Sequence, residues 1–300
     1  MTRLNTITNQ LVKALLLYLK KKQHVLIANT EGTLVEDTRV YTRLFIRAVA
    51  SNGKEMQTGA HGPGALQGFE FIENLDLDFY ANDAARQAVT MLNAGPCPSG
   101  KMPVVIDNGF GGVIFHEACG HGLEASSVAK GLSVFANKLG EQVANPIVTA
   151  IDDGTIPNAW GSLNVDDEGT PTQRKVLIEN GILKSYMIDK LNGRRMKMAS
   201  TGSGRRQNYR FAPTSRMTNT FIAERFQNTR DENLVANTEY GLYAKSMGAV
   251  QLILEQVTLI LPLMKDILFV MEKLLNPFVV QHSLVMDQLF YTKLIWSVKT

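Results

Sequence analysis

Two histidines and a glutamate lie within six consecutive residues of this 300-residue chain, at His116, Glu117 and His121. Two neutral imidazoles can hold Zn²⁺, and an adjacent carboxylate can take a proton from a water molecule that the ion activates. These residue types indicate metal-assisted hydrolysis, with His116 and His121 as metal ligands and Glu117 as the general base. Alternatively, the same three residues could be polar side chains near a turn whose hydrogen bonds are made within the protein, without a metal.

The five-residue spacing of the two histidines constrains the local structure. In the common H-E-x-x-H arrangement the histidines lie four residues apart, roughly 40° apart around a helix, whereas residues five apart differ by roughly 140°. A straight α-helix cannot direct both imidazoles at one ion. A π-bulge brings residues i and i+5 onto one face, and such bulges are frequent at functional sites. We therefore predict a π-bulge near Cys119-Gly120.

Other potential metal ligands are less favourable. Cys119 lies between the histidines, where its side chain should point away from them, so we expect a small buried thiol. Glu124 follows the second histidine by three residues and could orient its imidazole. His61 and Cys97 lie in glycine- or proline-flanked segments, where ordinary loop roles are expected.

Two acidic segments and one glycine-rich segment could also contribute polar groups. Asp152–Gly154 and Asp166–Gly169 are typical of turns, although the second could bind a metal. Thr201–Arg206 (TGSGRR) ends in two fixed charges that could hold a carboxylate or a phosphate. It lacks the lysine-threonine pair of a nucleotide-binding loop, so a peptide contact and a purely structural loop remain open.

The N-terminal hundred residues predict a sheet accompanied by helices. The leucine, alanine and lysine content of Gln10–Lys20 favours a helix, whereas His24–Asn29 and Arg39–Ser51 have the apolar or alternating pattern of strands. Asn82–Leu92 predicts a helix capped by its first residue and ended by Gly95-Pro96. We place a domain boundary in Pro96–Lys101.

Short strands and turns dominate the sequence after that boundary. Met102–Ile106 is an apolar strand, followed by glycines and by the histidine motif on a helix. Val176–Ile178 and Ile182–Ile188 flank Asn180-Gly181, a strong sequence signal for a two-residue hairpin turn.

Composition excludes several classes of partner and location. The 31 basic and 28 acidic residues give a net charge of +3, which creates no field that favours nucleic acid or an anionic membrane. Only two cysteines occur, and no secretory leader opens the sequence, so we expect a cytoplasmic protein. The apolar stretch 250–275 contains several charged residues, which makes it unsuitable as a membrane span.

Eight segments, in order along the chain, resemble the TldD/PmbA peptidases. They are His24–Gly32 (HVLIANTEG), Gly111–Glu124 (GGVIFHEACGHGLE), Asp152–Gly154 (DDG), Asp166–Gly169 (DDEG), Leu177–Leu183 (LIENGIL), Thr201–Arg206 (TGSGRR), Arg216–Thr220 (RMTNT) and Gly241–Ala244 (GLYA). The HExxxH segment resembles the TldD subunit, because the PmbA (TldE) partner lacks it.

This resemblance implies a cytoplasmic zinc protease that works as a heterodimer with a PmbA/TldE-like subunit. It further implies that unfolded peptides bind as an added β-strand and are matured or degraded. By the same resemblance, His116 and His121 bind zinc and Glu117 is the base. The family has also been described as a modulator of DNA gyrase, which does not require direct binding of nucleic acid.

The expected fold class is α+β, in three parts. Residues 1–99 are a sheet-and-helix remnant of the N-terminal and central domains, truncated at the N-terminus relative to the family. Residues 100–248 form an incomplete, mainly β metalloprotease domain with one HExxxH helix. Residues 249–300 are interpreted as an out-of-frame tail, because the resemblance stops after Gly248 and another reading frame of the same codons can spell family-like sequence.

The out-of-frame interpretation of residues 249–300 has a consequence for activity. The family implies a third zinc ligand, a cysteine near the C-terminus, and no cysteine follows Cys119 in this chain. We therefore expect an impaired or inactive metalloprotease whose tail has no selected fold and does not complete the zinc site through His282. The alternatives are a non-catalytic peptide-binding or interaction subunit that pairs with a PmbA/TldE-like partner, and a metal-free structural protein.

Overall fold

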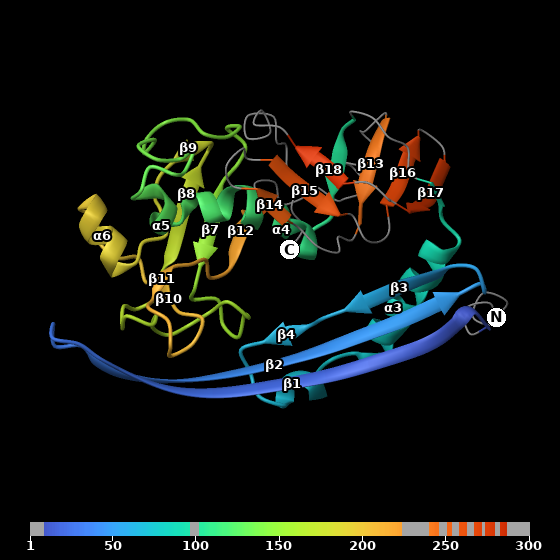
Figure 1. Ribbon diagram of the computed structural model, residues 1–300, viewed down its shortest axis with the longest axis horizontal. Helices are drawn as coiled ribbons and strands as arrows, with labels where there is room; N and C mark the ends of the chain where they lie inside the picture. The colour runs from blue at the N-terminus through green and yellow to red at the C-terminus, as the bar shows by residue number, and fades with distance from the viewer. Residues whose placement is uncertain are drawn as a thin grey trace.

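The computed structural model describes residues 9–96, 102–223 and 240–245, together with five short strands between residues 251 and 286. Figure 1 shows a long, gently curved sheet along one side of the molecule and a more compact α+β part on the other. The expected α+β class is confirmed: strands predominate, accompanied by few and short helices. Within the described residues, no helix is both long and apolar enough to cross a membrane.

The N-terminal sheet has the strand order β1-β2-β3, with β4 also paired to β2. Its strands are β1 (Leu11–Ala28), β2 (Leu34–Ser51), β3 (Met56–His61) and β4 (Gly64–Ala65), and the helices α2 (Glu70–Glu73) and α3 (Leu77–Leu92) follow. Alternate residues of β2, from Leu44 to Ala50, are buried against α3. This period of two matches the strand predicted at Arg39–Ser51.

The prediction of a helix at Gln10–Lys20 is wrong. Apart from its first residue, this segment belongs to β1, which pairs with β2 along its whole length, from Leu11 opposite Ala50 to Ala28 opposite Leu34. Pairing with an adjacent long strand satisfies the backbone groups that a helix would satisfy internally, so tertiary context overrides the local helical preference.

The start of α3 also differs from the prediction. The helix begins at Leu77, and the side chain of Asp76 accepts a hydrogen bond from the backbone N–H of Phe79 at 2.8 Å. Asn82, the predicted cap, lies inside the helix. Aspartate before the first turn is an effective cap, and the sequence pattern concealed it because the first turn carries exposed residues.

The second part of the molecule surrounds a four-stranded antiparallel sheet with the order β12-β7-β8-β9. Its elements are β6 (Val104–Ile106), η1 (Gly109–Gly112), α4 (Val113–Phe115), η2 (His116–Gly120), η3 (His121–Leu123), α5 (Ala125–Val128), β7 (Ala150–Asp153), β8 (Arg174–Glu179), β9 (Ile182–Leu183), α6 (Lys190–Met196), β10 (Gly204–Arg205), β11 (Thr214–Ser215) and β12 (Thr220–Ile222).

The hairpin predicted around Asn180-Gly181 is confirmed. Strands β8 and β9 pair antiparallel, and Asn180 and Gly181 have φ angles of 49° and 81°. Two consecutive positive φ angles are typical of the turn type that asparagine-glycine favours. The second strand ends at Leu183, earlier than predicted, because the backbone N–H groups of the next two residues both turn back to the carbonyl of Leu177.

One predicted acidic turn is a buried strand instead. Asp152 and Asp153 end β7 and are nearly inaccessible to solvent. The Asp152 carboxylate lies 2.8 Å from the buried Lys175 ammonium and accepts hydrogen bonds from the backbone and hydroxyl of Thr218. Such pairing makes a buried carboxylate tolerable, and it fixes the segment that follows β11 against β7.

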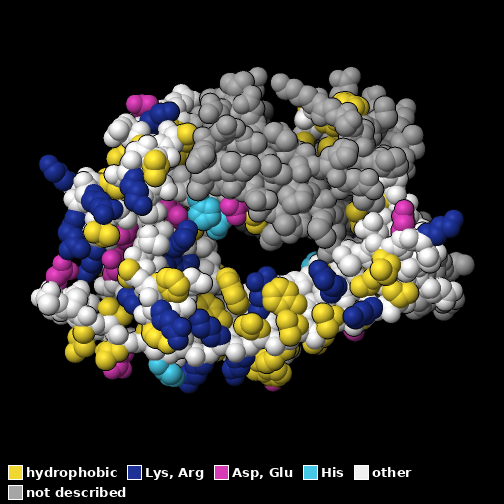
Figure 2. Space-filling view, viewed as in Figure 1, with side chains coloured by type: hydrophobic (Ala, Val, Ile, Leu, Met, Phe, Trp, Pro, Cys, Tyr) yellow, Lys and Arg dark blue, Asp and Glu magenta, His cyan; other side chains and the backbone are white. Residues whose placement is uncertain are grey.

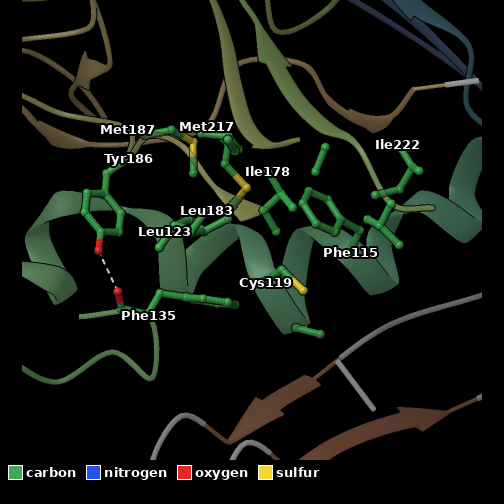
Figure 3. Close-up of a cluster of buried hydrophobic side chains, with 14 of the residues drawn as sticks. Phe115, Cys119, Leu123, Phe135, Ile178, Leu183, Tyr186, Met187, Met217 and Ile222 are labelled. Atoms are coloured by element: carbon green, nitrogen blue, oxygen red, sulfur yellow. Dashed lines mark hydrogen bonds between the residues drawn. The ribbon is translucent and has the colours of Figure 1, made fainter. Parts of the chain in front are cut away.

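The hydrophobic core of this part packs the histidine-bearing helix against the sheet. Phe115, Cys119 and Leu123 belong to one buried cluster with Ile178, Leu183 and Met217. Figure 3 shows Phe115 beside Ile178 and Leu123 beside Leu183, and the hydroxyl of Tyr186 donates to the Phe135 carbonyl at 2.6 Å. Phe115, Cys119 and Leu123 recur every four residues, so one face of the helical stretch is buried and the other is left for polar groups.

A further sheet has the order β5-β17-β16-β13-β6, and a three-stranded sheet has the order β14-β15-β18. Besides β6, these two sheets contain β5 (Gly95–Pro96), β13 (Tyr240–Ala244), β14 (Gln251–Ile253), β15 (Thr258–Pro262), β16 (Ile267–Met271), β17 (Leu274–Val279) and β18 (Ser283–Met286). Five of these strands lie in the segment interpreted as out of frame. Their backbone pairing does not test that interpretation, which stays a prediction, as does the division of the chain into three parts.

Candidate metal centre

The predicted helix distortion is present at the histidine motif. Residues His116–Gly120 form one π-helical turn, preceded by α4 and followed by the 3₁₀ turn η3. Gly120 enables the close packing of this turn, since a Cβ atom there would overlap the sulfur of Met217. The prediction of a π-bulge near Cys119-Gly120 is therefore confirmed. The close contact between Gly120 and the buried Met217 requires a residue without a side chain at this point of the turn.

The π-turn brings the two imidazoles together. The ring centroids of His116 and His121 are 5.0 Å apart, with an angle of 84° between the ring planes. Ligand atoms of His116, Glu117 and His121 all lie within 4.8 Å of one another. Two ligand atoms bonded to one ion at about 2.1 Å are expected at a separation of about 4 Å or less, so small side-chain adjustments suffice for a shared ion.

Glu117 lies beside the histidine pair. One of its carboxylate oxygens is 3.6 Å from Nε2 of His121, and both side chains are partly accessible to solvent. Figure 2 shows histidine and acidic side chains together at the edge of a hollow between the long sheet and the compact part.

The second histidine has a network of its own. Nδ1 of His121 lies 3.2 Å from one oxygen of the buried Glu124 carboxylate, whose other oxygen accepts from Arg216 Nη1 at 3.3 Å. Glu124 thus occupies the place expected of a carboxylate that orients an imidazole. The sequence alone assigns Arg216 no role, although this residue opens one of the family-like segments, because nothing local links it to a residue 92 positions earlier.

The environment shifts the pKa values of the two histidines in opposite directions. Burial and, to a smaller extent, the nearby His121 lower the pKa of His116 to about 4, so His116 is neutral at neutral pH. The hydrogen bond to Glu124 raises the pKa of His121, and the charges of Glu124 and Glu117 act in the same direction. One imidazole therefore offers a free lone pair, and the other lies in a position that favours positive charge.

The remaining candidates lie elsewhere. Cys119 is buried in the hydrophobic core, where burial raises the pKa of its thiol, so the expected structural role agrees with its position. His61 ends strand β3 and not a loop, and its ring contacts Asp83 and Gln87 of α3, so it does not join the histidine motif. Cys97 and His282 lie outside the described residues. Within the described residues, the histidine motif provides the single group of three potential metal ligands.

The acidic segment Asp166–Gly169 and the glycine-rich segment Thr201–Arg206 are hydrogen-bonded to each other. Asp166 accepts hydrogen bonds from backbone N–H groups of Glu168, Thr170 and Gly204, and Asp167 accepts from the backbone of Arg206. The Asp166–Gly169 turn therefore holds the start of β10 in place. This arrangement favours the structural interpretation of both segments over a metal or phosphate site.

A cavity of about 640 Å³ lies between β2 and the loops around residues 154–164. Its lining residues include Thr38, Thr155 and Ser162. None of its lining residues belongs to the histidine motif.

Two family models match the chain. Residues 3–92 match the central domain of the PmbA/TldA metallopeptidases, and residues 99–261 match their C-terminal domain. Together these matches cover most of the sequence, including the long sheet and the histidine motif.

Curated relatives are described as metalloproteases. A TldD homolog from Haemophilus influenzae is 43% identical over 234 residues, which cover 76% of this chain and 48% of the relative. A metalloprotease from Methanocaldococcus jannaschii is 39% identical over 216 residues, covering 72% of this chain and 47% of the relative. The chain thus spans about half the length of the curated relatives that it matches.

Solved structures share the fold. A Thermotoga maritima protein described as a candidate modulator of a DNA gyrase superposes with a TM-score of 0.80 at 23% identity, over 97% of this chain and 65% of that chain. TldE from Thermococcus kodakarensis gives a TM-score of 0.76 at 18% identity, over 93% of this chain and 61% of that chain. At these identities the similarity establishes the architecture alone.

Proposed function

This chain belongs to the PmbA/TldD metallopeptidase family, and we propose that it carries the zinc-binding half of a TldD-type peptidase site. Membership of a metallopeptidase family implies a metal ion. The observation that supports zinc at His116 and His121, with Glu117 as the base, is the π-turn that directs all three side chains to one place.

The donor set fits a divalent cation. His116 is neutral at neutral pH because its pKa is about 4, so it can donate a lone pair without first losing a proton. At His121, the carboxylates of Glu124 and Glu117 favour a positive charge, and a bound cation would satisfy the same preference. Two imidazoles are typical zinc ligands, so zinc is the proposed ion.

The chain's own residues would perform the proton transfers of peptide hydrolysis. A zinc ion held by His116 and His121 would supply Lewis-acid activation of water and of the peptide carbonyl. Glu117 would take a proton from the attacking water and return it to the leaving nitrogen. Its carboxylate oxygen lies 3.6 Å from His121 Nε2, and the Glu117 side chain is partly accessible to solvent.

Substrate, partner and location extend this proposal. We propose unfolded peptides as substrates, held extended as an added strand, because a sheet edge can recognise backbone without selecting side chains. We propose a TldE-like subunit as the partner, because the chain shares its fold with TldE. The proposed location is the cytoplasm. Nucleic acid is not a proposed ligand, because the net charge of +3 provides no strong positive field.

Two imidazoles alone hold zinc weakly, so the third ligand decides whether this chain is active. In the family the third ligand is expected to be a cysteine from the C-terminal segment, and the proposed frameshift after Gly248 would remove it. We therefore propose an impaired enzyme. Restoring the frame after Gly248 should strengthen zinc binding, whereas equally tight binding by both forms would contradict the need for the cysteine.

The general-base role has a direct test in a full-length, in-frame version of the protein. Glu117→Gln should abolish cleavage of an unfolded peptide while bound zinc stays at the wild-type level, because the carboxylate transfers a proton and does not ligate the metal. Cleavage would be followed by mass spectrometry, and zinc by elemental analysis. Lost zinc in the variant would make Glu117 a ligand instead.

Two outcomes of the same assay would favour the alternatives. Peptide binding without cleavage, in the in-frame protein supplied with zinc, would indicate a non-catalytic peptide-binding subunit. Absence of zinc binding together with unchanged folding would indicate a structural protein. The double variant His116→Ala, His121→Ala is the matched negative control for zinc binding.

A further inference from the structure

Glu124 lies at a junction that fixes its backbone. It follows the 3₁₀ turn that ends the histidine motif and has an extended conformation, with φ −74° and ψ 129°. On either side of it, the backbone N–H of Met187 donates to the Leu123 carbonyl at 3.0 Å and the N–H of Ala125 donates to the Met187 carbonyl at 2.8 Å. The position of this residue is therefore set by the sheet side of the core and not by the helix alone.

The two oxygens of the Glu124 carboxylate have different partners. One oxygen lies 3.2 Å from Nδ1 of His121, and the other accepts from Nη1 of Arg216 at 3.3 Å. An ionised carboxylate only accepts hydrogen bonds, so the contact with His121 requires the proton on Nδ1. The lone pair of the neutral imidazole is then on Nε2, the nitrogen that faces Glu117.

Burial makes this carboxylate dependent on its partners. The Glu124 side chain is 4% exposed, whereas the Arg216 side chain is 51% exposed and can retain water on one side. A buried carboxylate without a partner is strongly unfavourable, so the contact with the guanidinium stabilises the Glu124 side chain in this position. The backbone N–H of Arg216 donates to the Ser203 carbonyl at 2.9 Å, which fixes the arginine at the end of β11.

We propose that Glu124 is a positioning residue of the metal site, and that Arg216 holds its carboxylate in place. The pair fixes the tautomer and the ring orientation of His121 so that Nε2 is presented to the ion. This inference rests on the proposed metal-binding function. Within the described residues His116 has no hydrogen bond to a carboxylate, so the orienting network serves one of the two histidines.

The tautomer of His121 can be measured without any metal. In the ¹⁵N-labelled, metal-free chain at a pH where the ring is neutral, long-range ¹H–¹⁵N spectra should report the proton of His121 on Nδ1. Glu124→Ala should shift the ring toward the Nε2–H form, and Arg216→Met should shift it partially. Glu179→Ala, which removes an exposed carboxylate paired with Lys184, is the matched control and should leave the spectrum unchanged.

Metal affinity gives a second readout. Removing a carboxylate that orients a zinc-bound histidine typically weakens binding 10- to 100-fold, and we expect a loss of about this size for Zn²⁺ and Co²⁺ in Glu124→Ala. The visible spectrum of bound Co²⁺ should also change, because one imidazole is reoriented. Glu124→Asp should recover part of the affinity, since a carboxylate remains.

The two readouts separate this inference from the proposed function. If the wild-type chain binds no metal, the tautomer experiment still decides whether Glu124 positions His121. Glu124→Gln, which keeps the side-chain size, replaces Glu124→Ala if the alanine variant does not fold. A Nδ1–H tautomer that persists in folded Glu124→Ala, or an unchanged Zn²⁺ affinity in that variant relative to Glu179→Ala, would overturn the proposal.

Discussion

At the residue scale, Gly120 links the candidate metal site to the core. A Cβ atom at this position would overlap the sulfur of Met217, whose side chain is itself buried. Gly120→Ala should therefore lower the free energy of unfolding by about 1–3 kcal/mol, the usual cost of forcing an extra methyl group into a packed core. Urea denaturation followed by circular dichroism would measure the change.

Gly112 offers a matched control on the same helical stretch. It has a helical φ of −59°, and a Cβ atom there would meet nothing within 4 Å. Gly112→Ala should leave stability within about 0.5 kcal/mol of wild type or raise it. Equal effects of the two substitutions would show that helix propensity, and not the contact with Met217, controls the π-turn.

At the element scale, a polar cluster joins α3 to β3. Although burial alone would raise the pKa of Asp83, hydrogen bonds from His61, Arg86 and Gln87 lower it to about 2. Because the folded pKa lies below the unfolded value of 3.8, the cluster contributes stability at pH above about 4 and loses it as pH falls toward 2.

Asp83→Asn tests the contribution of this cluster. At pH 7 the variant should lose about 1 kcal/mol of unfolding free energy, and its deficit should shrink between pH 4 and pH 2, where the wild-type carboxylate also becomes protonated. Thermal melting across this pH range would measure the difference. Glu36→Gln, at an exposed position of β2, is the control; a deficit in Asp83→Asn that is independent of pH would contradict the assignment.

At the scale of the whole molecule, Arg39 connects the long sheet to the part that carries the histidine motif. Its buried guanidinium lies 3.1 Å from Asp37 on the same strand and 2.7 Å from Asp167, and it donates to the Val165 carbonyl at 2.9 Å. The two carboxylates are 130 residues apart in the sequence, and Arg39 joins them near the start of β2.

Arg39→Met should therefore destabilise both parts together. Removing one partner of a buried ion pair typically costs about 3–5 kcal/mol, because the remaining charges stay buried without compensation. We expect a lower unfolding midpoint and faster limited proteolysis of the segments that contact β2. Arg47→Met, at an exposed position of the same strand, should change the midpoint little. A loss below about 1 kcal/mol in Arg39→Met would indicate that the other contacts between the two parts suffice.

Local sequence determined the chemistry of the candidate site. Residue types and spacing at His116, Glu117 and His121 predicted a metal centre and required a π-turn, because no straight helix can place residues five apart on one face. The hairpin at Asn180-Gly181 could also be predicted from local sequence, because few residue types form a turn with two positive φ angles. These features depend on neighbours within a few positions.

Tertiary structure decided what depends on distant partners. Gln10–Lys20 has helical content, yet it forms a strand because β2 supplies backbone hydrogen bonds along its whole length. Asp152 is typical of a turn in isolation, and only the buried Lys175 and Thr218 make it part of a strand. Arg216 reaches Glu124 across 92 residues of sequence, so its contact beside the candidate metal site is set by folding: a long-range ion pair leaves no periodicity or spacing in the sequence.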